Sequence, residues 1–94
     1  MNASSHARYR IAIIGMGKGG AKLAMIFSED QNIQIIGVSN RNQEAPGIQW
    51  AKQQGIFTTP DYRELLSLPD LNIVIDASGN AEVGTYLDTI GHTA

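Results

Sequence analysis

Three glycines at fixed spacing, Gly15, Gly17 and Gly20, directly follow a short apolar run at 11–14. An apolar segment rich in alanine begins immediately after the third glycine. Where a strand leads through such a turn into a helix, backbone N–H groups and the positive helix end attract phosphate. The first glycine allows the tight turn, the second lets a pyrophosphate approach, and the third packs the helix on the strand. The pattern predicts a phosphate-binding turn whose candidate ligand contacts are Gly15, Met16, Gly17, Lys18, Gly19 and Gly20.

Two other interpretations of this turn need to be weighed. The glycines also fit a purely structural turn whose site stays empty. Gly15 and Gly20 have the spacing of an ATPase phosphate loop as well, but Ala21 and Lys22 stand where that loop needs lysine and a hydroxyl residue. We therefore exclude an ATPase. Lys18 either contacts the phosphate or stays solvated, and Met16 lines the crevice through its place in the turn.

A second group of candidate contacts, Ser39, Asn40 and Arg41, follows the apolar run at 33–38. Dinucleotide-binding domains carry an acid about 20 residues after the last glycine, where it binds the ribose hydroxyls. Because Asn40 stands there instead, no carboxylate would repel a 2′-phosphate, and Ser39 and Arg41 could bind one through charge-assisted hydrogen bonds. We expect NADP or NAD as cofactor, with NADP mildly favoured. Alternatively, Arg41 is merely solvated, or binding was lost together with the acid.

A third group, Ser78, Gly79 and Asn80, follows the apolar run that ends at Asp76. These residues would form a wall of the cofactor crevice near the inner ribose. They also suit a turn in which Ser78 or Asn80 caps the last helix, and we expect both roles together. Asp76 is expected at a buried strand end, as a structural hydrogen-bonding group rather than a catalytic base.

Strand and helix patterns alternate along the chain. Apolar, β-branched runs predict strands at 9–14, 33–38, 56–59 and 71–76. Helices are expected at 18–28, 48–54, from 61 to just before Pro69, and at 81–90. Such alternation implies a doubly wound α/β fold with a parallel sheet of about four strands, order 3-2-1-4, and helices on both faces. Ligands bind such sheets beyond the carboxyl ends of the strands, so the fold would bring the three groups of candidate residues together.

Local signals refine two of these helices. Gly55 and Gly91 are expected to end the helices before them, in the position that glycine favours. Asp61 and Glu64 have the spacing of a capping box, in which each residue would satisfy a backbone N–H of the other.

Composition limits the class of protein. With 94 residues we expect one domain at 10–94, preceded by a flexible N-terminal arm at 1–9. A net charge of −2 without a basic run argues against nucleic-acid binding. The absence of cysteine excludes disulfides and thiolate metal sites and fits a cytoplasmic location, and no apolar run is long enough to suggest a membrane partner. His6 and His92 have no partner at metal-binding or catalytic spacing, so we expect no metal and no catalytic residues.

Segments 10–20, 37–38, 51–56, 61–66 and 71–77 occur in a register that resembles the N-terminal cofactor domain of the glucose–fructose oxidoreductase and inositol dehydrogenase family. Homoserine dehydrogenase and dihydrodipicolinate reductase are similar at the first strand and at 75–80. The segment 38–47 also resembles stand-alone Rossmann segments of some bacterial sensor kinases. The resemblance implies NAD(P) binding, although the chain departs from it at Asn40. It also implies that catalysis needs a substrate domain that these residues do not include.

Three functions follow from this reasoning. The first is a dinucleotide-binding module without its own catalysis, acting as a regulatory or sensory domain or as a fragment of a larger protein. The second is the cofactor half of an NAD(P)-dependent oxidoreductase that lacks its substrate domain. The third is a Rossmann-like protein-interaction domain with an empty site. Because a short sheet leaves an edge uncovered, we expect a homodimer or a fused partner domain.

Overall fold

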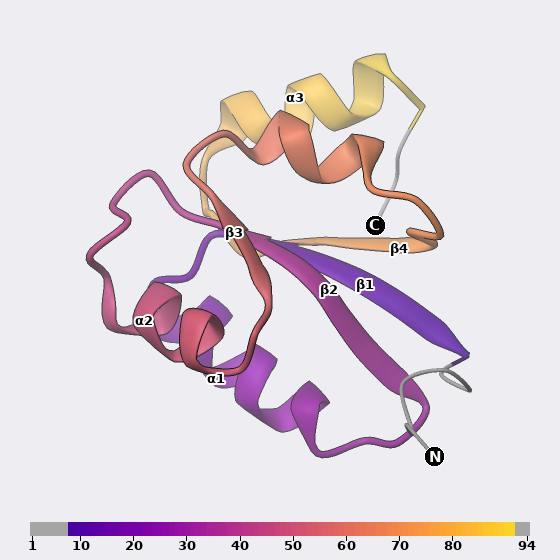
Figure 1. Ribbon diagram of the computed structural model, residues 1–94. Helices are drawn as coiled ribbons and strands as arrows, with labels where there is room; N and C mark the ends of the chain where they lie inside the picture. The colour runs from indigo at the N-terminus through magenta and orange to yellow at the C-terminus, as the bar shows by residue number, and fades with distance from the viewer. Residues whose placement is uncertain (1–7, 92–94) are drawn as a thin grey trace.

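Four parallel strands form one sheet in the order β3-β2-β1-β4, as predicted from the sequence (Figure 1). The structure, a computed structural model, describes residues 8–91; His6, His92 and the predicted arm up to residue 7 lie outside this range. The strands are β1 (Tyr9–Ile14), β2 (Ile33–Ser39), β3 (Phe57–Thr59) and β4 (Ile73–Asp76). The helices are α1 (Lys18–Ser28), α2 (Pro46–Gln53), the 3-10 helix η2 (Tyr62–Ser67) and α3 (Ala81–Thr89).

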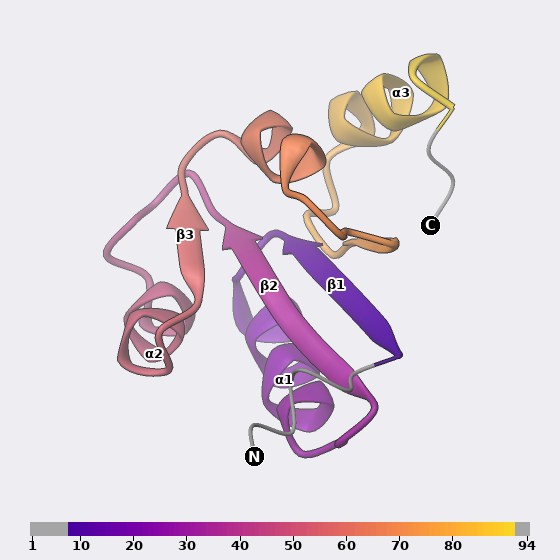
Figure 2. The same cartoon turned by 45° about the vertical axis from the view of Figure 1, so that its right-hand side comes forward.

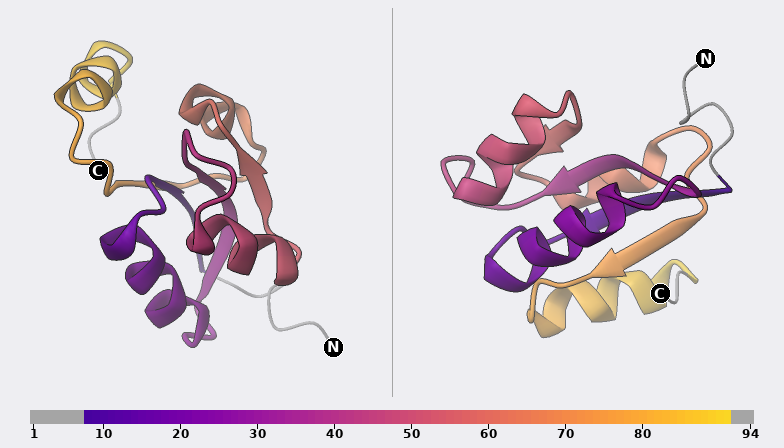
Figure 3. Two further views of the ribbon diagram at one scale, coloured as in Figure 1. Left: turned by 90° about the vertical axis from the view of Figure 1, so that its left-hand side faces the viewer. Right: turned by 90° about the horizontal axis from the view of Figure 1, so that it is seen from below.

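Helices cover both faces of the sheet, which confirms the doubly wound α/β class (Figure 2). Helices α1 and α2 lie on one face, whereas η2 and α3 lie on the other, as the left-hand view of Figure 3 shows. Each face has its own apolar core. The core under α1 and α2 consists of Ile11, Ile13, Met16, Ala24, Ile35, Val38, Ile48 and Ala51, and the core under η2 and α3 of Ala12, Ile14, Leu65, Val74, Val83 and Leu87.

An irregularity in β2 decides which of its residues face which core. Ile11 pairs with Ile35, but the next residue of β1 pairs with Gly37, so Ile36 is an extra residue in the ladder. A bulge of this kind shifts the alternation of side chains by one. Gly37 consequently faces η2, where an added Cβ would lie 2.8 Å from Leu65 Cδ2. A larger residue here would require the leucine side chains packed over the strand to shift.

Helix α1 approaches the sheet through its small residues, as expected. Gly20 and Ala24 are buried against the strands, and Phe27 is partly buried beside them. A Cβ at Gly20 would lie only 1.8 Å from the carbonyl oxygen of Gly15. The close contact between the turn and the first helical residues therefore depends on the absence of that side chain.

Two helices differ from the sequence prediction. Helix α2 begins at Pro46 rather than Ile48, because proline at the first helical position has a suitable fixed φ and needs no N–H acceptor. It ends near Gly55, whose φ is +75°, as predicted. The helix predicted after residue 61 is instead the short 3-10 helix η2, which runs from Tyr62 to Ser67.

The predicted capping box at Asp61 and Glu64 is wrong. Asp61 Oδ1 accepts from the backbone N–H of Arg63, at 3.0 Å. The carboxylate of Glu64 accepts from the hydroxyl of Thr59 instead of reaching back to the N–H of residue 61. That N–H donates to the Thr59 hydroxyl oxygen at 3.1 Å. The buried hydroxyl of Thr59 thus takes both partners of one of the two predicted capping-box bonds, the one between the Glu64 carboxylate and the N–H of Asp61.

Candidate functional site

The carboxyl ends of the four strands open onto one cavity of about 740 Å³. The residues that line it, seven of which are predicted contacts, come from the segment after each strand. The predicted contacts among them are Gly15, Gly17, Ser39, Asn40, Arg41, Ser78 and Asn80. The remaining lining residues are Ile14, Asn42, Pro60, Asp61, Tyr62, Arg63, Ala77, Glu82 and Val83. The fold thus brings the three candidate groups to one place.

The glycine turn is built against the exit of β4. Gly15 has φ +94°, and a Cβ there would lie 2.7 Å from Ser78 Cα, so no other residue fits without a shift. Its N–H donates to the carbonyl oxygen of Ser39 at 2.8 Å, and Ala77 N–H donates to Ile14 O at 2.8 Å. The turn is therefore held from both neighbouring strands.

Gly17 both faces open space and lines the cavity. It is the residue that precedes α1, with no side-chain cap, and it lines the cavity. A Cβ at this position would meet no atom within 4 Å. The first turn of an α-helix has N–H groups without acceptors within the helix, and these together with the helix dipole favour an anion. An anion can therefore approach the backbone N–H groups of this turn without meeting a side chain at Gly17.

Five predicted contacts do not line the cavity. The Met16 side chain is 1% exposed and packs in the core under α1 and α2, so it does not line the crevice as expected. Gly20 is buried under α1. Lys18, Gly19 and Gly79 are exposed outside the cavity lining.

The end of β2 presents Ser39, Asn40 and Arg41 in three different settings. Ser39 is 2% exposed and lines the cavity next to the glycine turn. Asn40 is half-buried, and its side-chain oxygen accepts from the backbone N–H of Met16 at 3.0 Å. Arg41 is exposed and lines the cavity, which leaves its guanidinium available to a ligand.

The exit of β4 is a hydrogen-bonded turn. Ser78 donates through both its N–H and its hydroxyl to Asp76 Oδ1, at 3.0 and 2.6 Å. The Asn80 side chain caps α3 by accepting from Glu82 N–H at 2.9 Å, so Asn80 is the cap. Asp76 has the expected hydrogen-bonding role but is exposed rather than buried, because β4 is an edge strand.

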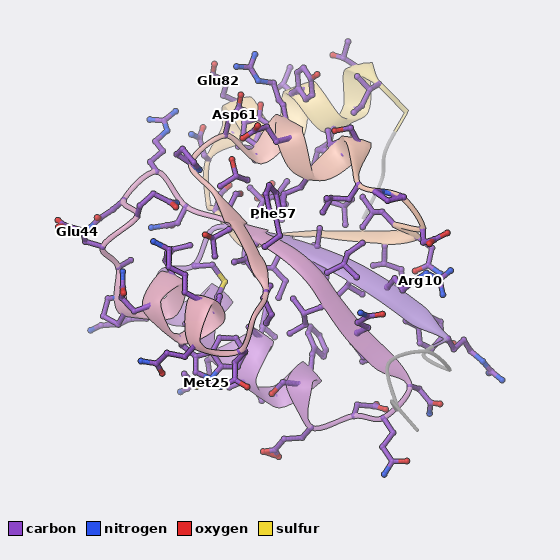
Figure 4. All side chains as sticks on the ribbon, in the orientation of Figure 1. Arg10, Met25, Glu44, Phe57, Asp61 and Glu82 are labelled. Atoms are coloured by element: carbon purple, nitrogen blue, oxygen red, sulfur yellow. The ribbon has the colours of Figure 1, made fainter. Side chains whose placement is uncertain are left out.

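The cavity wall that follows β3 was not predicted from the sequence; it contains Pro60, Asp61, Tyr62 and Arg63. The predicted parallel sheet could have indicated this wall, because the carboxyl ends of all parallel strands lie at the same edge of the sheet. Tyr62 packs edge-on against Tyr86 of α3 with ring centroids 5.7 Å apart. Asp61, before η2, and Glu82, in α3, are labelled in Figure 4, and both line the cavity.

An ion pair lies in this wall. Arg63 Nε is 3.1 Å from Asp61 Oδ1, and both side chains are largely exposed. The side-chain and backbone hydrogen bonds from Arg63 lower the pKa of Asp61 below its ordinary value of 3.8. The same pair raises the pKa of Arg63 above its ordinary value. The cavity thus carries a neutralised pair beside the separate cation Arg41.

We expect a small, pH-dependent contribution of this pair to stability. Because folding lowers the pKa of Asp61, the contribution is present above the unfolded pKa and is lost as pH falls through the lowered value. The difference in Tm between wild type and Asp61→Asn should stay constant from about pH 8 to about pH 5 and shrink below about pH 4. Asp88→Asn, at an exposed carboxylate of α3, corrects for the general effect of charge. A difference that widens in acid would contradict the sign.

Two features are absent from the described range, residues 8–91. No group of three or more His, Cys, Asp or Glu side chains there could hold a metal ion. In the same range, no helix is long and apolar enough to cross a membrane.

Known proteins match this chain in structure rather than in sequence. No protein-family profile matches it, and no curated protein matches it significantly. GenD2 from gentamicin A biosynthesis, solved in complex with NAD, has a TM-score of 0.78 at 20% identity, over 93% of this chain and 26% of GenD2. An NAD-binding protein from Listeria innocua has a TM-score of 0.68 at 23% identity, over 90% of this chain and 26% of that protein.

A third solved structure is similar. A protein assigned as an NADPH-dependent oxidoreductase from Desulfitobacterium hafniense DCB-2 has a TM-score of 0.70 at 16% identity, over 85% of this chain and 23% of that protein. The chain therefore spans about a quarter of the length of each of these three proteins. At such identities the likeness establishes the fold: these residues form a short Rossmann-like α/β domain.

Proposed function

We propose that this domain binds a nicotinamide dinucleotide across the carboxyl ends of its strands and has no catalysis of its own. The observation that carries the proposal is the open space at Gly17, at the start of α1 and on the wall of the cavity. A pyrophosphate needs such an approach to backbone N–H groups. The names of the three structural neighbours, which mention NAD, NADPH or NAD binding, support the same ligand class.

In this proposal each part of the dinucleotide has a place in the cavity. The pyrophosphate lies at the turn 15–20, the adenosine half extends toward Ser39 and Arg41, and the other half lies toward Ser78 and Asn80. NADP is favoured over NAD for two reasons. Arg41 offers a cation to the 2′-phosphate, and Asn40 stands where a carboxylate would otherwise repel that phosphate. Lys18 and Gly19, at the start of α1, are proposed to contact the phosphates from outside the cavity lining.

The rest of the proposal concerns the larger setting of the domain. Its fold and length relative to its neighbours fit the cofactor-binding part of an oxidoreductase-like protein, related to the glucose–fructose oxidoreductase family. A regulatory domain of a signalling protein would use the same site. We propose a cytoplasmic location, in keeping with the absence of cysteine, and a homodimer or fused domain that covers the β4 edge.

Fluorescence titration with NADPH and NADH tests the proposal. Wild type should saturate with at least one of them, and the substitution Gly17→Ala should weaken binding about tenfold or more, because its methyl group occupies the approach to the turn. Stability should not fall, since the added Cβ meets no atom within 4 Å. Gly84→Ala in α3, whose Cβ would also meet nothing within 4 Å, is the matched control and should bind like wild type.

The same titration separates the alternatives. No saturation by either nucleotide at millimolar concentration would reject dinucleotide binding and leave the protein-interaction domain. Equal binding by wild type and Gly17→Ala would mean that the phosphates lie elsewhere.

A further inference from the structure

One flank of helix α1 carries apolar side chains that are exposed to solvent. Ile26 is 60% exposed, and Leu23, one turn earlier, is half-buried. Helix α2 packs on another flank, since a Cβ at Gly47 would lie 3.0 Å from Ala21 Cβ. With about 3.6 residues per turn, Ile26 lies about 140° around the helix from Ala21. Ile26 is therefore on the flank of α1 that faces away from α2.

Strand β4 presents apolar side chains on the side of the sheet that carries α1. Ile73 and Ile75 pair in register with two residues of β1, Ile11 and Ile13. Because those two residues lie in the core under α1 and α2, Ile73 and Ile75 face that side as well. Ile73 is 36% exposed, and α1 lies between α2 and β4 in the right-hand view of Figure 3. The flank of α1 and this face of β4 form the two sides of one apolar strip, which consists of Leu23, Ile26, Ile73 and Ile75.

Charged residues on the same flank of α1 stand in the order that the helix dipole disfavours. Lys22 lies four residues before Ile26 and Asp30 four residues after it, which is the spacing of one helix face. Acidic side chains stabilise the start of a helix and basic ones its end, but α1 has no acid in its first turn and no base in its last. Among residues 8–91, Lys22 forms no ion pair, and the Asp30 carboxylate accepts from Asn32 N–H at 2.8 Å. This order of charges does not stabilise the isolated domain.

We propose that a second copy of this chain packs its α1 antiparallel against this flank, about a two-fold axis that passes beside Ile26. In an antiparallel pair centred on residue 26, each residue before the centre meets the residue equally far after it in the other copy. Lys22 of each copy therefore meets Asp30 of the other, and the two Ile26 side chains meet at the centre. The two helix dipoles run in opposite directions, so the acidic end of each helix lies beside the basic half of the other.

The second helix also covers β4. Packed helices lie about 8–10 Å apart, which is about two strand spacings. A helix at this distance from α1, on the side away from α2, lies over Ile73 and Ile75. The two-fold axis buries the strip of both copies at once. The inference specifies the homodimer that the proposed function names as one of two covers for the β4 edge, and it does not depend on dinucleotide binding.

Sedimentation of the full chain at protein concentrations up to about 0.5 mM tests the dimer, because small interfaces associate weakly. Wild type should sediment as a dimer at the upper concentrations. Ile26→Glu should stay monomeric, since it places two carboxylates against each other at the centre. Met25→Glu is the matched control, because Met25 is 45% exposed on α1 but lies about 100° around the helix from Ile26. This control should dimerise like wild type, and circular dichroism verifies that each variant folds.

Exchanging the charges tests which residues meet. Lys22→Glu and Asp30→Lys should each weaken the dimer about tenfold or more, because each places two pairs of like charges together. Mixing the two variants should restore association, since a dimer with one copy of each has opposite charges at both contacts. The variant that carries both substitutions should dimerise like wild type for the same reason.

The outcomes distinguish a second copy from the other cover of β4 and from nucleotide binding. Wild type that stays monomeric at the highest concentration would overturn the inference and leave a fused domain as the cover. Equal dimerisation of Ile26→Glu and wild type, or a mixture of the charge variants that does not associate, would also overturn it. Lys22, Ile26 and Asp30 are not among the described residues that line the cavity, so Ile26→Glu should bind NADPH like wild type. Absence of NADPH and NADH binding in a dimeric wild type would reject the proposed function and leave the dimer standing.

Discussion

Gly20→Ala should destabilise the domain severely. The added Cβ would lie 1.8 Å from the carbonyl oxygen of Gly15, and this neighbour is backbone that cannot rotate away. Relieving the overlap requires moving α1 away from β1, which would loosen the packing of Ala24 and the core under it. We expect a loss of about 3 kcal/mol or more in the free energy of unfolding, at the upper end of overpacking effects. For a chain of this size that is a large part of the total stability.

Urea unfolding followed by circular dichroism measures this effect, and the adjacent glycine provides the control. Gly19 is also within α1, but a Cβ there would meet no atom within 4 Å. Gly19→Ala should therefore be neutral or stabilise the protein by up to about 1 kcal/mol, because alanine favours a helix. Similar unfolding curves for the two variants would mean that α1 does not approach the turn as closely as the structure indicates.

The architecture followed from the sequence because its signals are local and repeated. An apolar run predicts each strand, and a helical pattern lies between each strand and the next. Because crossovers between parallel strands are right-handed, few strand orders are possible in a four-stranded sheet. Gly20 could be assigned to close packing of helix on strand because it belongs to a local glycine pattern between the two. Once the sheet is parallel, the segments after its strands share one edge, so the grouping of Ser39, Arg41, Ser78 and Asn80 needed no side-chain detail.

The sequence does not show which of several possible partners a side chain contacts when those partners are distant in the chain. Glu64 has the spacing of a capping residue, yet the buried Thr59 hydroxyl takes its carboxylate. Met16 stands in the turn, but the core beneath it offers more apolar contact than the cavity. The hydrogen bond from Met16 N–H to the Asn40 side chain likewise arises only from the folded arrangement of β1 and β2. In each case, the packing of the fold determines which residue lies beside the side chain.

The bulge in β2 belongs to the same class of outcome. An apolar run at 33–38 predicts a strand but does not show that Ile36 is unpaired. The bulge turns Gly37 toward η2 and keeps Val38 in the core on the other face. It therefore decides how the last residues of the strand, including Ser39, enter the cavity.

Arg41→Glu should change the choice of nucleotide more than any other single substitution in the cavity. Arg41 is an exposed cation on the cavity wall, and our proposal places the 2′-phosphate of NADP against it. Replacing a charge-assisted hydrogen bond by like-charge repulsion should weaken NADPH binding by about 2–3 kcal/mol, which is roughly 30- to 150-fold. NADH has no 2′-phosphate, so its Kd should change only about twofold, through the general loss of positive charge.

Parallel titrations of NADPH and NADH at fixed ionic strength measure this selectivity, and Lys22→Glu is the control. Lys22 is exposed on α1, outside the cavity lining, and carries the same reversal of charge. It should alter both affinities slightly and equally. An equal, large loss of NADPH and NADH in Arg41→Glu would refute a 2′-phosphate at Arg41, because the side chain would then contact something common to both nucleotides. A selective loss of NADPH at low salt that persists near physiological salt would place the phosphate in direct contact with the guanidinium, since long-range attraction is screened there.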